Sequence, residues 1–196
     1  MGHNPSQFHV NSIVKAYIIS ESFLWSAWNF ITPIFAVFVV NDIAGGSIEV
    51  AASGYSVYLV ARVIFELLAG RYLMRTDDGK KLLVAIIGII CMSAGYLGFA
   101  ISATVPMLFL SYSIIGIGLG IASPAKNSLF SLHLDKNKEA TEWGIADAVS
   151  FICTAIAAVL GGFIATKYGF DTLFIIACIV NFISILPYAV YIKKGK

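Results

Sequence analysis

The sequence predicts an all-α membrane protein with six transmembrane helices. Of its 196 residues, 59% are hydrophobic and 12% are charged, whereas a soluble domain has roughly 25% charged residues. The mean hydropathy is +0.86. Since the net charge is only +2, this composition excludes an ordinary soluble enzyme, an extended disordered chain and a nucleic-acid-binding protein with a basic face.

Six apolar stretches are long enough to cross a bilayer, which takes about 20 residues of helix. We expect helices at 13–40, 49–73, 82–103, 106–127, 143–166 and 172–192, with an optional extension of the fourth to 134. Turn-forming residues separate them at 41–47, 77–79 and 168–169, and Pro106 divides the long uncharged stretch 82–125. The connections leave no room for a soluble domain. We therefore expect one domain over 1–196, with the first three helices in 1–104 and the last three in 105–196.

The distribution of basic residues predicts the orientation, because cytoplasmic connections are enriched in lysine and arginine. Three segments share this enrichment: Arg71, Arg75, Lys80 and Lys81 after the second helix, Lys126, Lys136 and Lys138 around the end of the fourth, and Lys193, Lys194 and Lys196 in the tail. The connections on the other side contain only Lys167. Both termini are therefore expected in the cytoplasm, and the protein is expected to be a multi-pass protein of the cell membrane.

The sequence implies no metal, organic cofactor or catalytic centre. Cys91, Cys153 and Cys178 lie in apolar stretches without paired spacing, which argues against a disulfide framework or a zinc site. His3, His9 and His133 lie outside or at the edge of the predicted membrane segments. Because no nucleophile and base occur together at membrane depth, we expect that the protein is not an enzyme.

Charged side chains inside the hydrocarbon are costly and usually functional. The predicted first helix contains Glu21, the second Arg62 and Glu66, and the fifth Asp147, whereas the third and sixth contain none. The first, second, fourth and fifth helices are therefore predicted to line a polar space. The third and sixth are predicted to face lipid or to support the others.

The first helix has a polar and aromatic stripe at helical spacing, followed by Pro33, which predicts a bend. The stripe comprises Glu21, Trp25, Trp28, Asn29 and Thr32. Glu21 and Arg62 both lie about eight residues, or roughly 12 Å, from the predicted cytoplasmic ends of their helices. We hypothesise that they form an ion pair, which either holds two helices in register or handles a substrate or proton. A third interpretation is that one of these charged side chains extends to the membrane–water interface instead.

Two further features have alternative interpretations. Trp25 and Trp28 either pack in the core or stack on a ligand. Asp147 either stabilises the start of its helix or lines the cavity together with Ser150 and Thr154, which share its helix face.

Glycines in the fourth and fifth helices indicate close packing, because small residues let membrane helices approach. The predicted packing positions are Gly116, Gly118, Gly120, Gly161 and Gly162. A phosphate-binding loop would require a preceding strand, which an apolar span does not provide. Pro124 and Asn127 are predicted to break the fourth helix.

Several of these segments resemble the N-terminal half of a major facilitator superfamily transporter. Residues 70–81, GRYLMRTDDGKK, are similar to the motif Gly-x-Leu-x-Asp-Arg-x-Gly-Arg-Lys of that family, with Met74 in place of the motif aspartate and Asp77 or Asp78 as its substitute. The resemblance implies a gating loop of Gly70, Arg75, Asp77, Asp78, Gly79, Lys80 and Lys81. Gly116 and Gly118 match Arg-x-x-x-Gly-x-Gly, with Tyr112 in place of the arginine, so the proton-coupling role of that arginine does not transfer. Gly161 and Gly162 match part of an antiporter motif, and 169–174, GFDTLF, resembles the family's entry to the sixth helix.

The resemblance implies two three-helix inverted repeats and a solute cavity near the middle of the membrane. It implies a half-size secondary transporter that moves a small solute by alternating access, with proton coupling as an option. Candidate pathway residues are Glu21, Trp25, Trp28, Asn29, Arg62, Glu66, Tyr112, Asn127 and Asp147. Because the family normally has twelve helices, the expected partner in the bilayer is a second copy or a separate six-helix half, unless the sequence is part of a longer chain. The alternative function is a non-transporting membrane interaction or assembly protein that retains the fold.

Overall fold

The structure, a computed structural model, describes residues 11–194 and the side chains of residues 11–190. The predictions made for His3, His9, Lys193, Lys194 and Lys196 fall outside these residues and side chains. The helices are α1 (Ser12–Ile31), a 3-10 turn η1 (Thr32–Ile34), α2 (Phe35–Asp42), α3 (Ile48–Tyr72), α4 (Asp78–Ala100), α5 (Val105–Leu132), α6 (Glu139–Tyr168), α7 (Phe170–Ile183) and α8 (Leu186–Lys194). They form six spans long and apolar enough to cross a membrane, with α1, η1 and α2 in the first and α7 continuing into α8 in the last. The predicted fold class and number of spans are confirmed.

Two helices begin earlier than their hydropathy predicts. α4 begins at Asp78 rather than at 82, because the Asp77 side chain accepts a hydrogen bond from the Lys80 amide and caps the helix. α6 begins at Glu139 rather than at 143, with Glu139 and Glu142 in its first turn. Acidic residues are favoured near the positive end of a helix dipole, so the polar residues that were assigned to connections form the first turns.

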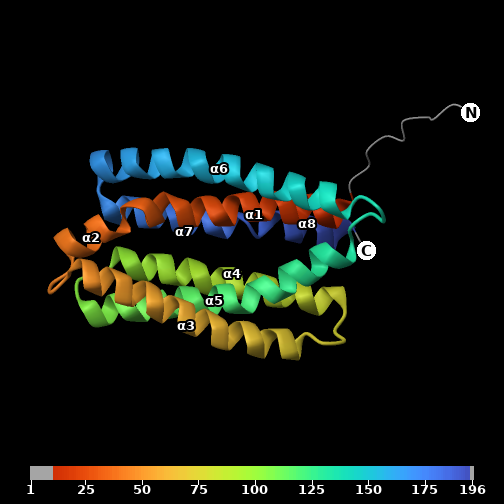
Figure 1. Cartoon of the computed structure of the whole chain (residues 1–196), viewed down its shortest axis with the longest axis horizontal. Helices are drawn as coiled ribbons and strands as arrows, with labels where there is room; N and C mark the ends of the chain where they lie inside the picture. Colours follow the sequence, from red (N-terminus) through yellow and green to blue (C-terminus); the bar gives the residue numbers. More distant parts are fainter. Residues whose placement is uncertain (1–10, 195–196) are drawn as a thin grey trace, which may run out of the picture.

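Proline acts differently in three helices. Pro33 lies at the start of η1, where the first span changes direction, as predicted. Pro124 does not end α5, which continues to Leu132 and bends in its last part (Figure 1). The predicted break at Pro124 and Asn127 is therefore wrong, because packed neighbours tolerate proline inside a membrane helix. Before Pro187, the last span is interrupted between α7 and α8.

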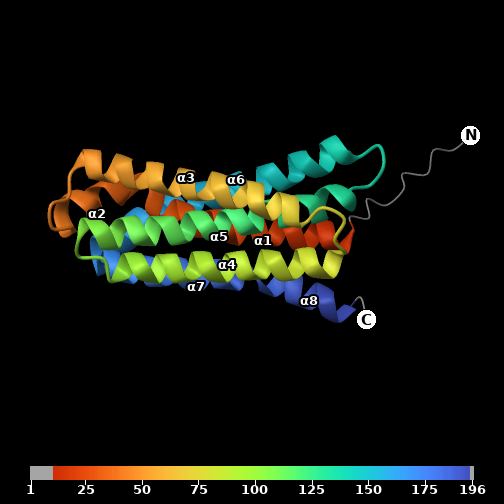
Figure 2. The same ribbon diagram turned by 90° about the horizontal axis from the view of Figure 1, so that it is seen from below.

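The helices form two groups that lie side by side along the bundle (Figure 1). In one group α1 packs against α6, α7 and α8, and in the other α5 packs against α3 and α4. The groups meet along the back, where α4 contacts α7, while α3 and α6 lie at the front (Figure 2). The main contacts of the two groups correspond, since α3 and α4 pack on α5 as α6 and α7 pack on α1. An internal inverted repeat stays a prediction.

Residues 11 and 194 lie at the same end of the bundle, which we name the terminus end (Figure 1). The opposite end, named the loop end, contains the connections after α2 and α4. There the Ala44 amide donates to the Ala103 carbonyl at 3.0 Å, joining the two connections. The basic connections predicted to be cytoplasmic lie at the terminus end, and the cytoplasmic orientation itself stays a prediction.

Glycines set the spacing around α5. A Cβ atom at Gly116 or Gly120 would collide with the backbone of α3 at Tyr58 or Arg62. A Cβ at Gly118, on the other face, would collide with the backbone of α4 at Gly88. The alternate glycines of this Gly-x-Gly pattern thus allow close approach of α3 and of α4 to α5.

The glycine pair of α6 divides into one packed and one open position. A Cβ at Gly161 would collide with the backbone of Phe30 in α1, whereas a Cβ at Gly162 would meet no atom within 4 Å. The packing contact predicted for Gly162 is therefore wrong, because this residue lies on the outward side of α6.

A buried asparagine joins the two groups along the back. Asn181 of α7 is fully buried, and its Nδ2 donates to the Ile89 carbonyl at 3.0 Å and to the Ser93 hydroxyl at 2.8 Å in α4. α4 thus supports the core, with half of its apolar stretch buried, compared with 11% for α6. α4 and α7, whose charged side chains lie only in their first turns, form a supporting layer behind the other helices.

Candidate functional site

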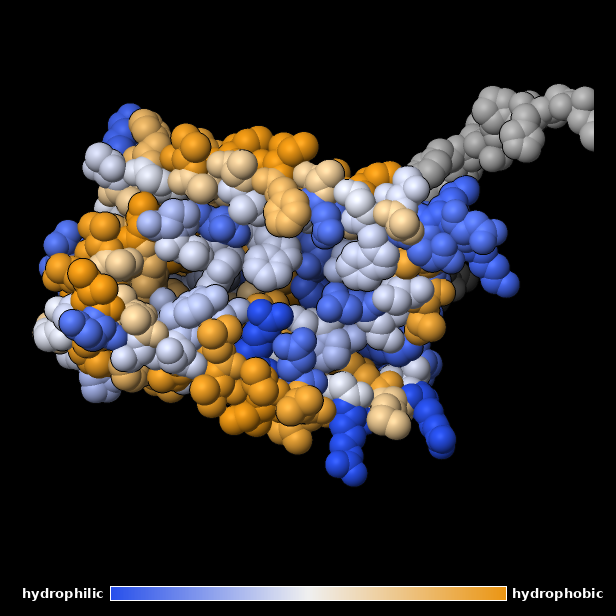
Figure 3. All heavy atoms as spheres, viewed as in Figure 1, coloured by the Kyte–Doolittle hydropathy of each residue, from blue (hydrophilic) through white to orange (hydrophobic). Residues whose placement is uncertain are grey.

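A cavity of about 530 Å³ lies between the two helix groups. Its lining comes from α1, α3, α5 and α6, the four helices expected to surround a polar space. Seven predicted pathway residues line it: Glu21, Trp25, Trp28, Asn29, Arg62, Asn127 and Asp147. Figure 3 shows hydrophilic surface along this hollow, between hydrophobic strips over α6 and α3.

The predicted Glu21–Arg62 ion pair is wrong. Glu21 instead pairs with Lys126 of α5, and both side chains are almost completely buried. The second Glu21 carboxylate oxygen accepts a hydrogen bond from Trp25 Nε1 at 3.0 Å. Since α5 continues past Pro124, Lys126 lies inside the bundle rather than in a connection, where it can reach α1.

Arg62 has a partner on its own helix. Its Nε lies 3.2 Å from Glu66 Oε2, and its Nη1 donates to the Tyr58 hydroxyl at 3.3 Å. Both charged side chains are partly exposed at the open side of the bundle. Arg62 lines the cavity, and Glu66 acts as its counter-ion from one turn away.

An aromatic cluster joins α1, α5 and α6 at the terminus end of the cavity. The Tyr17 hydroxyl donates to Asn127 Oδ1 at 3.0 Å, and the Tyr17 ring stacks on Phe130 at 4.1 Å between centroids. Phe130 also meets Trp143 edge to face at 4.6 Å. These contacts, together with the Glu21–Lys126 pair, connect the two groups on the terminus side.

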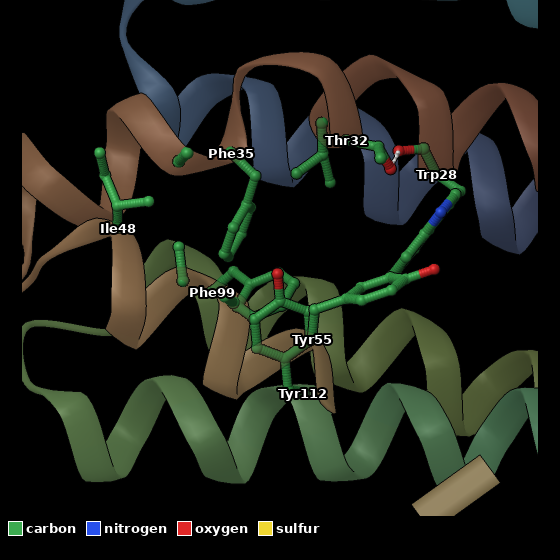
Figure 4. A pocket seen from close by; sticks show the side chains of 11 residues that line it. Trp28, Thr32, Phe35, Ile48, Tyr55, Phe99 and Tyr112 are labelled. Atoms are coloured by element: carbon green, nitrogen blue, oxygen red, sulfur yellow. Dashed lines mark hydrogen bonds between the residues drawn. The ribbon is translucent and has the colours of Figure 1, made fainter. Parts of the chain in front are cut away.

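A second, mainly aromatic pocket of about 380 Å³ lies nearer the loop end. Phe35, Tyr55, Phe99 and Tyr112 surround it (Figure 4). Tyr112 therefore lines this pocket rather than the polar cavity. Trp28 lines both pockets and stacks on Tyr58 of α3 at 4.9 Å, so it packs across the groups while bordering the cavity.

Asp147 lies well inside α6. Because α6 begins at Glu139, Asp147 lies about two turns after the helix start, and the interpretation of Asp147 as an acid that stabilises the helix start is wrong. Helix dipole effects fall off within the first turn. Asp147, Ser150 and Thr154 together line the cavity.

The two aspartates of the predicted gating loop have different roles. Asp77 caps α4, whereas Asp78 pairs with Lys81 at 3.7 Å and with His133 Nε2, beyond the end of α5, at 3.3 Å. Of the two predicted substitutes for the motif aspartate, Asp78 is therefore the one that reaches another helix. Arg75 adopts a left-handed backbone with φ 62°. Two glycines complete the loop: Gly70 lies near Pro124, and Gly79 lies near Asp77 in the first turn of α4.

Six cavity residues escaped the sequence analysis: Tyr17, Ser123, Lys126, Trp143, Ala146 and Phe151. The apolar pair Leu129 and Phe130 follows Lys126 at helical spacing and is buried. This pair is the signal that the fourth helix continues and that Lys126 lies within it. Within residues 11–194, no group of three metal-binding side chains occurs.

Comparison with known proteins identifies the family. A search of the curated proteins finds no significant match. The family model described as the Major Facilitator Superfamily matches residues 17–195, nearly the whole chain. Together with the six apolar helices, which indicate an integral multi-pass membrane protein, this match shows that the chain belongs to the major facilitator superfamily.

Proposed function

We propose that the protein is a secondary transporter that moves a small solute across the cell membrane by alternating access. The observation that carries the proposal is the cavity between the two helix groups. Its volume of about 530 Å³ is that of a small-molecule site. It combines aromatic walls with charged and hydroxyl groups at membrane depth, where such groups commonly mark a transport path. The proposal assigns the protein no chemical reaction and no cofactor.

The open side of the cavity supports the need for a partner. Arg62, Glu66 and Asp147 are partly or fully exposed on the face between α3 and α6, where lipid would leave them poorly solvated. We propose that a second six-helix unit, either another copy of this chain or a separate half, covers this face. Rocking of the two units would then open the cavity to alternate sides.

Glu21 is the proposed proton or cation site, and Lys126 replaces Arg62 as its partner in the proposal. When Glu21 is ionised it is neutralised by Lys126. Protonation would leave Lys126 as an uncompensated buried cation, which is unfavourable. A proton on Glu21 would therefore favour a different arrangement of α1 and α5, and this arrangement provides the coupling.

Proteoliposomes that contain a pH-sensitive dye test the transport proposal. We expect at least one member of a panel of amines, amino acids, sugars and carboxylates to cause a proton or solute flux above that of empty liposomes. Glu21→Gln should change the pH dependence of this flux, whereas Glu49→Gln, at the exposed start of α3, should not. Equal fluxes in empty liposomes and proteoliposomes for the whole panel would contradict transport.

Native mass spectrometry in nanodiscs tests the proposed partner. Purified protein should give a mass of two chains that is independent of dilution, or a stable complex with a separate six-helix protein when isolated from its source membrane. A single uncomplexed chain that still transports solute would contradict the need for a second unit.

A further inference from the structure

We infer that the cavity binds a small organic cation with an apolar or aromatic body, and that Asp147 is its counter-ion. This inference rests on the proposed function and adds the chemical class of the solute. It follows from the balance of charges around the cavity and from the aromatic composition of its walls.

One carboxylate at the cavity has no counter-ion within the described part of the chain. Glu21 is neutralised by Lys126, and Arg62 is neutralised by Glu66. Asp147 lines the same cavity and has no ion pair or hydrogen bond to its side chain among the described residues. Glu66 does not line the cavity, but it pairs with Arg62 from one turn away and brings the net charge of the site to −1. The site therefore attracts a positively charged solute.

The wall around this carboxylate suits an ammonium group. Trp25 and Trp28 of α1 and Trp143 of α6 all line the cavity. Tryptophan faces attract cations more strongly than other aromatic side chains do, and cages of aromatic residues bind quaternary ammonium groups. A carboxylate combined with three tryptophans thus distinguishes a cation from a neutral or anionic solute of the same size.

Two hydroxyl side chains extend the site along the cavity face of α6. Ser150 and Thr154 lie three and seven residues after Asp147 on the cavity side, so they follow it along the helix face. They accept hydrogen bonds from polar groups on the body of the solute. Lys126 does not oppose the binding of a cation, because its charge is directed to Glu21 in a buried contact.

The tryptophans also provide a direct measurement. The chain contains three tryptophans, and all three line this cavity. Tryptophan fluorescence of the full chain in nanodiscs therefore reports the occupancy of this site. Because Trp28 also lines the aromatic pocket, the Asp147 variants distinguish binding in the polar cavity from binding there. We would titrate phenyltrimethylammonium as the cationic probe and benzenesulfonate as the anion of similar size, at constant ionic strength.

The expected result is a saturable fluorescence change with phenyltrimethylammonium and none with benzenesulfonate. Asp147→Asn should raise the apparent Kd about tenfold or more, because the ionic contact is lost. Asp147→Glu, which keeps the charge and controls for folding, should bind within about threefold of the wild type. Asp171→Asn makes the same chemical change at the exposed start of α7, outside the cavity, and should leave the Kd unchanged.

An unchanged Kd in Asp147→Asn, or equal binding of benzenesulfonate, would overturn the inference. A loss of the two-chain mass in Asp147→Asn, without any effect on the titration, would show that Asp147 pairs with a partner unit instead. Liposome flux keeps the two proposals separate. Saturable binding of the cation without flux contradicts transport but supports the site, whereas flux of other solutes without binding of the cation contradicts only this inference.

Discussion

The two sides of α5 differ in how they meet the rest of the molecule. On two of its faces Gly116, Gly118 and Gly120 bring the backbones of α3 and α4 into contact with α5. On the other side a cavity separates α5 from α1, and the two helices meet through the Glu21–Lys126 pair and the Tyr17–Asn127 hydrogen bond. The first contact is continuous and apolar, whereas the second consists of a few polar bonds and the stack of Tyr17 on Phe130.

This difference indicates which contacts can change without unfolding. Separating α3 from α5 would expose a long close-packed surface and forfeit many small dispersion contacts at once. Separating the end of α5 from α1 breaks one ion pair, one hydrogen bond and the stack of Tyr17 on Phe130, and the polar groups can find other partners, such as water or a solute. A helix of this kind holds one wall of a cavity in place while its other face responds to the contents of the cavity.

The largest expected effect comes from removing Lys126. Lys126→Met leaves the Glu21 carboxylate buried without its cation, which should lower the free energy of unfolding by about 3–5 kcal/mol. Lys80→Met, at an exposed position of α4, should cause little change. Thermal and denaturant unfolding in detergent, followed by circular dichroism, provide the measurement.

The double variant Glu21→Gln/Lys126→Met sharpens this prediction. It removes both charges together and should recover most of the lost stability. If the two single losses simply added, the pair would not be a coupled unit, and the polar side of α5 would resemble its apolar side more closely than the structure indicates.

The second effect concerns the packed side. Gly120→Leu forces a side chain against the backbone of α3 and should reduce stability by about 1–3 kcal/mol. Gly162→Leu places the same side chain in open space on α6 and should be neutral or slightly stabilising. Equal unfolding midpoints of the two variants would mean that the glycines of α5 do not set the helix spacing.

A smaller effect is expected at the back of the bundle. Asn181→Leu removes the two hydrogen bonds from α7 to α4 and should cost about 1–2 kcal/mol. Thr172→Val removes a hydroxyl that donates only to the carbonyl of Tyr168, four residues earlier at the end of α6, and should be close to neutral. The difference between their midpoints measures how strongly the back layer joins the two groups.

The smallest effect is expected at the α3–α4 connection. Asp78→Asn weakens the contacts of a partly exposed carboxylate with the buried Lys81 and the partly exposed His133, and we expect a loss of about 1 kcal/mol or less that high salt diminishes further. His133→Gln should cause a similar loss, without a further decrease in the double variant. A loss as large as that of Lys126→Met would place this surface contact among the main connections of the bundle.

The spans could be predicted from the sequence because the bilayer sets the minimum length of an apolar helix. Their starts were harder to predict. A hydropathy pattern begins at the first apolar residue, whereas a helix begins at its cap, so Asp78 and Glu139 were assigned to connections. Counting an acidic first turn as part of the following helix would have found both starts.

The cavity helices could be predicted from the positions of their charges, but the pairing of those charges could not. Glu21 and Arg62 lie at similar depth, and depth alone does not determine which neighbouring helix supplies the counter-ion. That choice depended on whether α5 passes through Pro124, a question of tertiary packing rather than of local preference. Because α5 continues, Lys126 faces α1 and pairs with Glu21, and Arg62 pairs with Glu66 on its own helix.

The position of residues 11 and 194 at one end of the bundle has a topological consequence (Figure 1). A chain that crosses the membrane an even number of times returns to the side from which it started. A second unit joined to either end by a short linker therefore enters the bilayer with the same orientation as the first and needs no additional crossing. Duplication of such a unit produces two parallel copies related by an axis along the membrane normal. The even number of spans therefore makes the fusion of two copies in one chain compatible with a face-to-face arrangement.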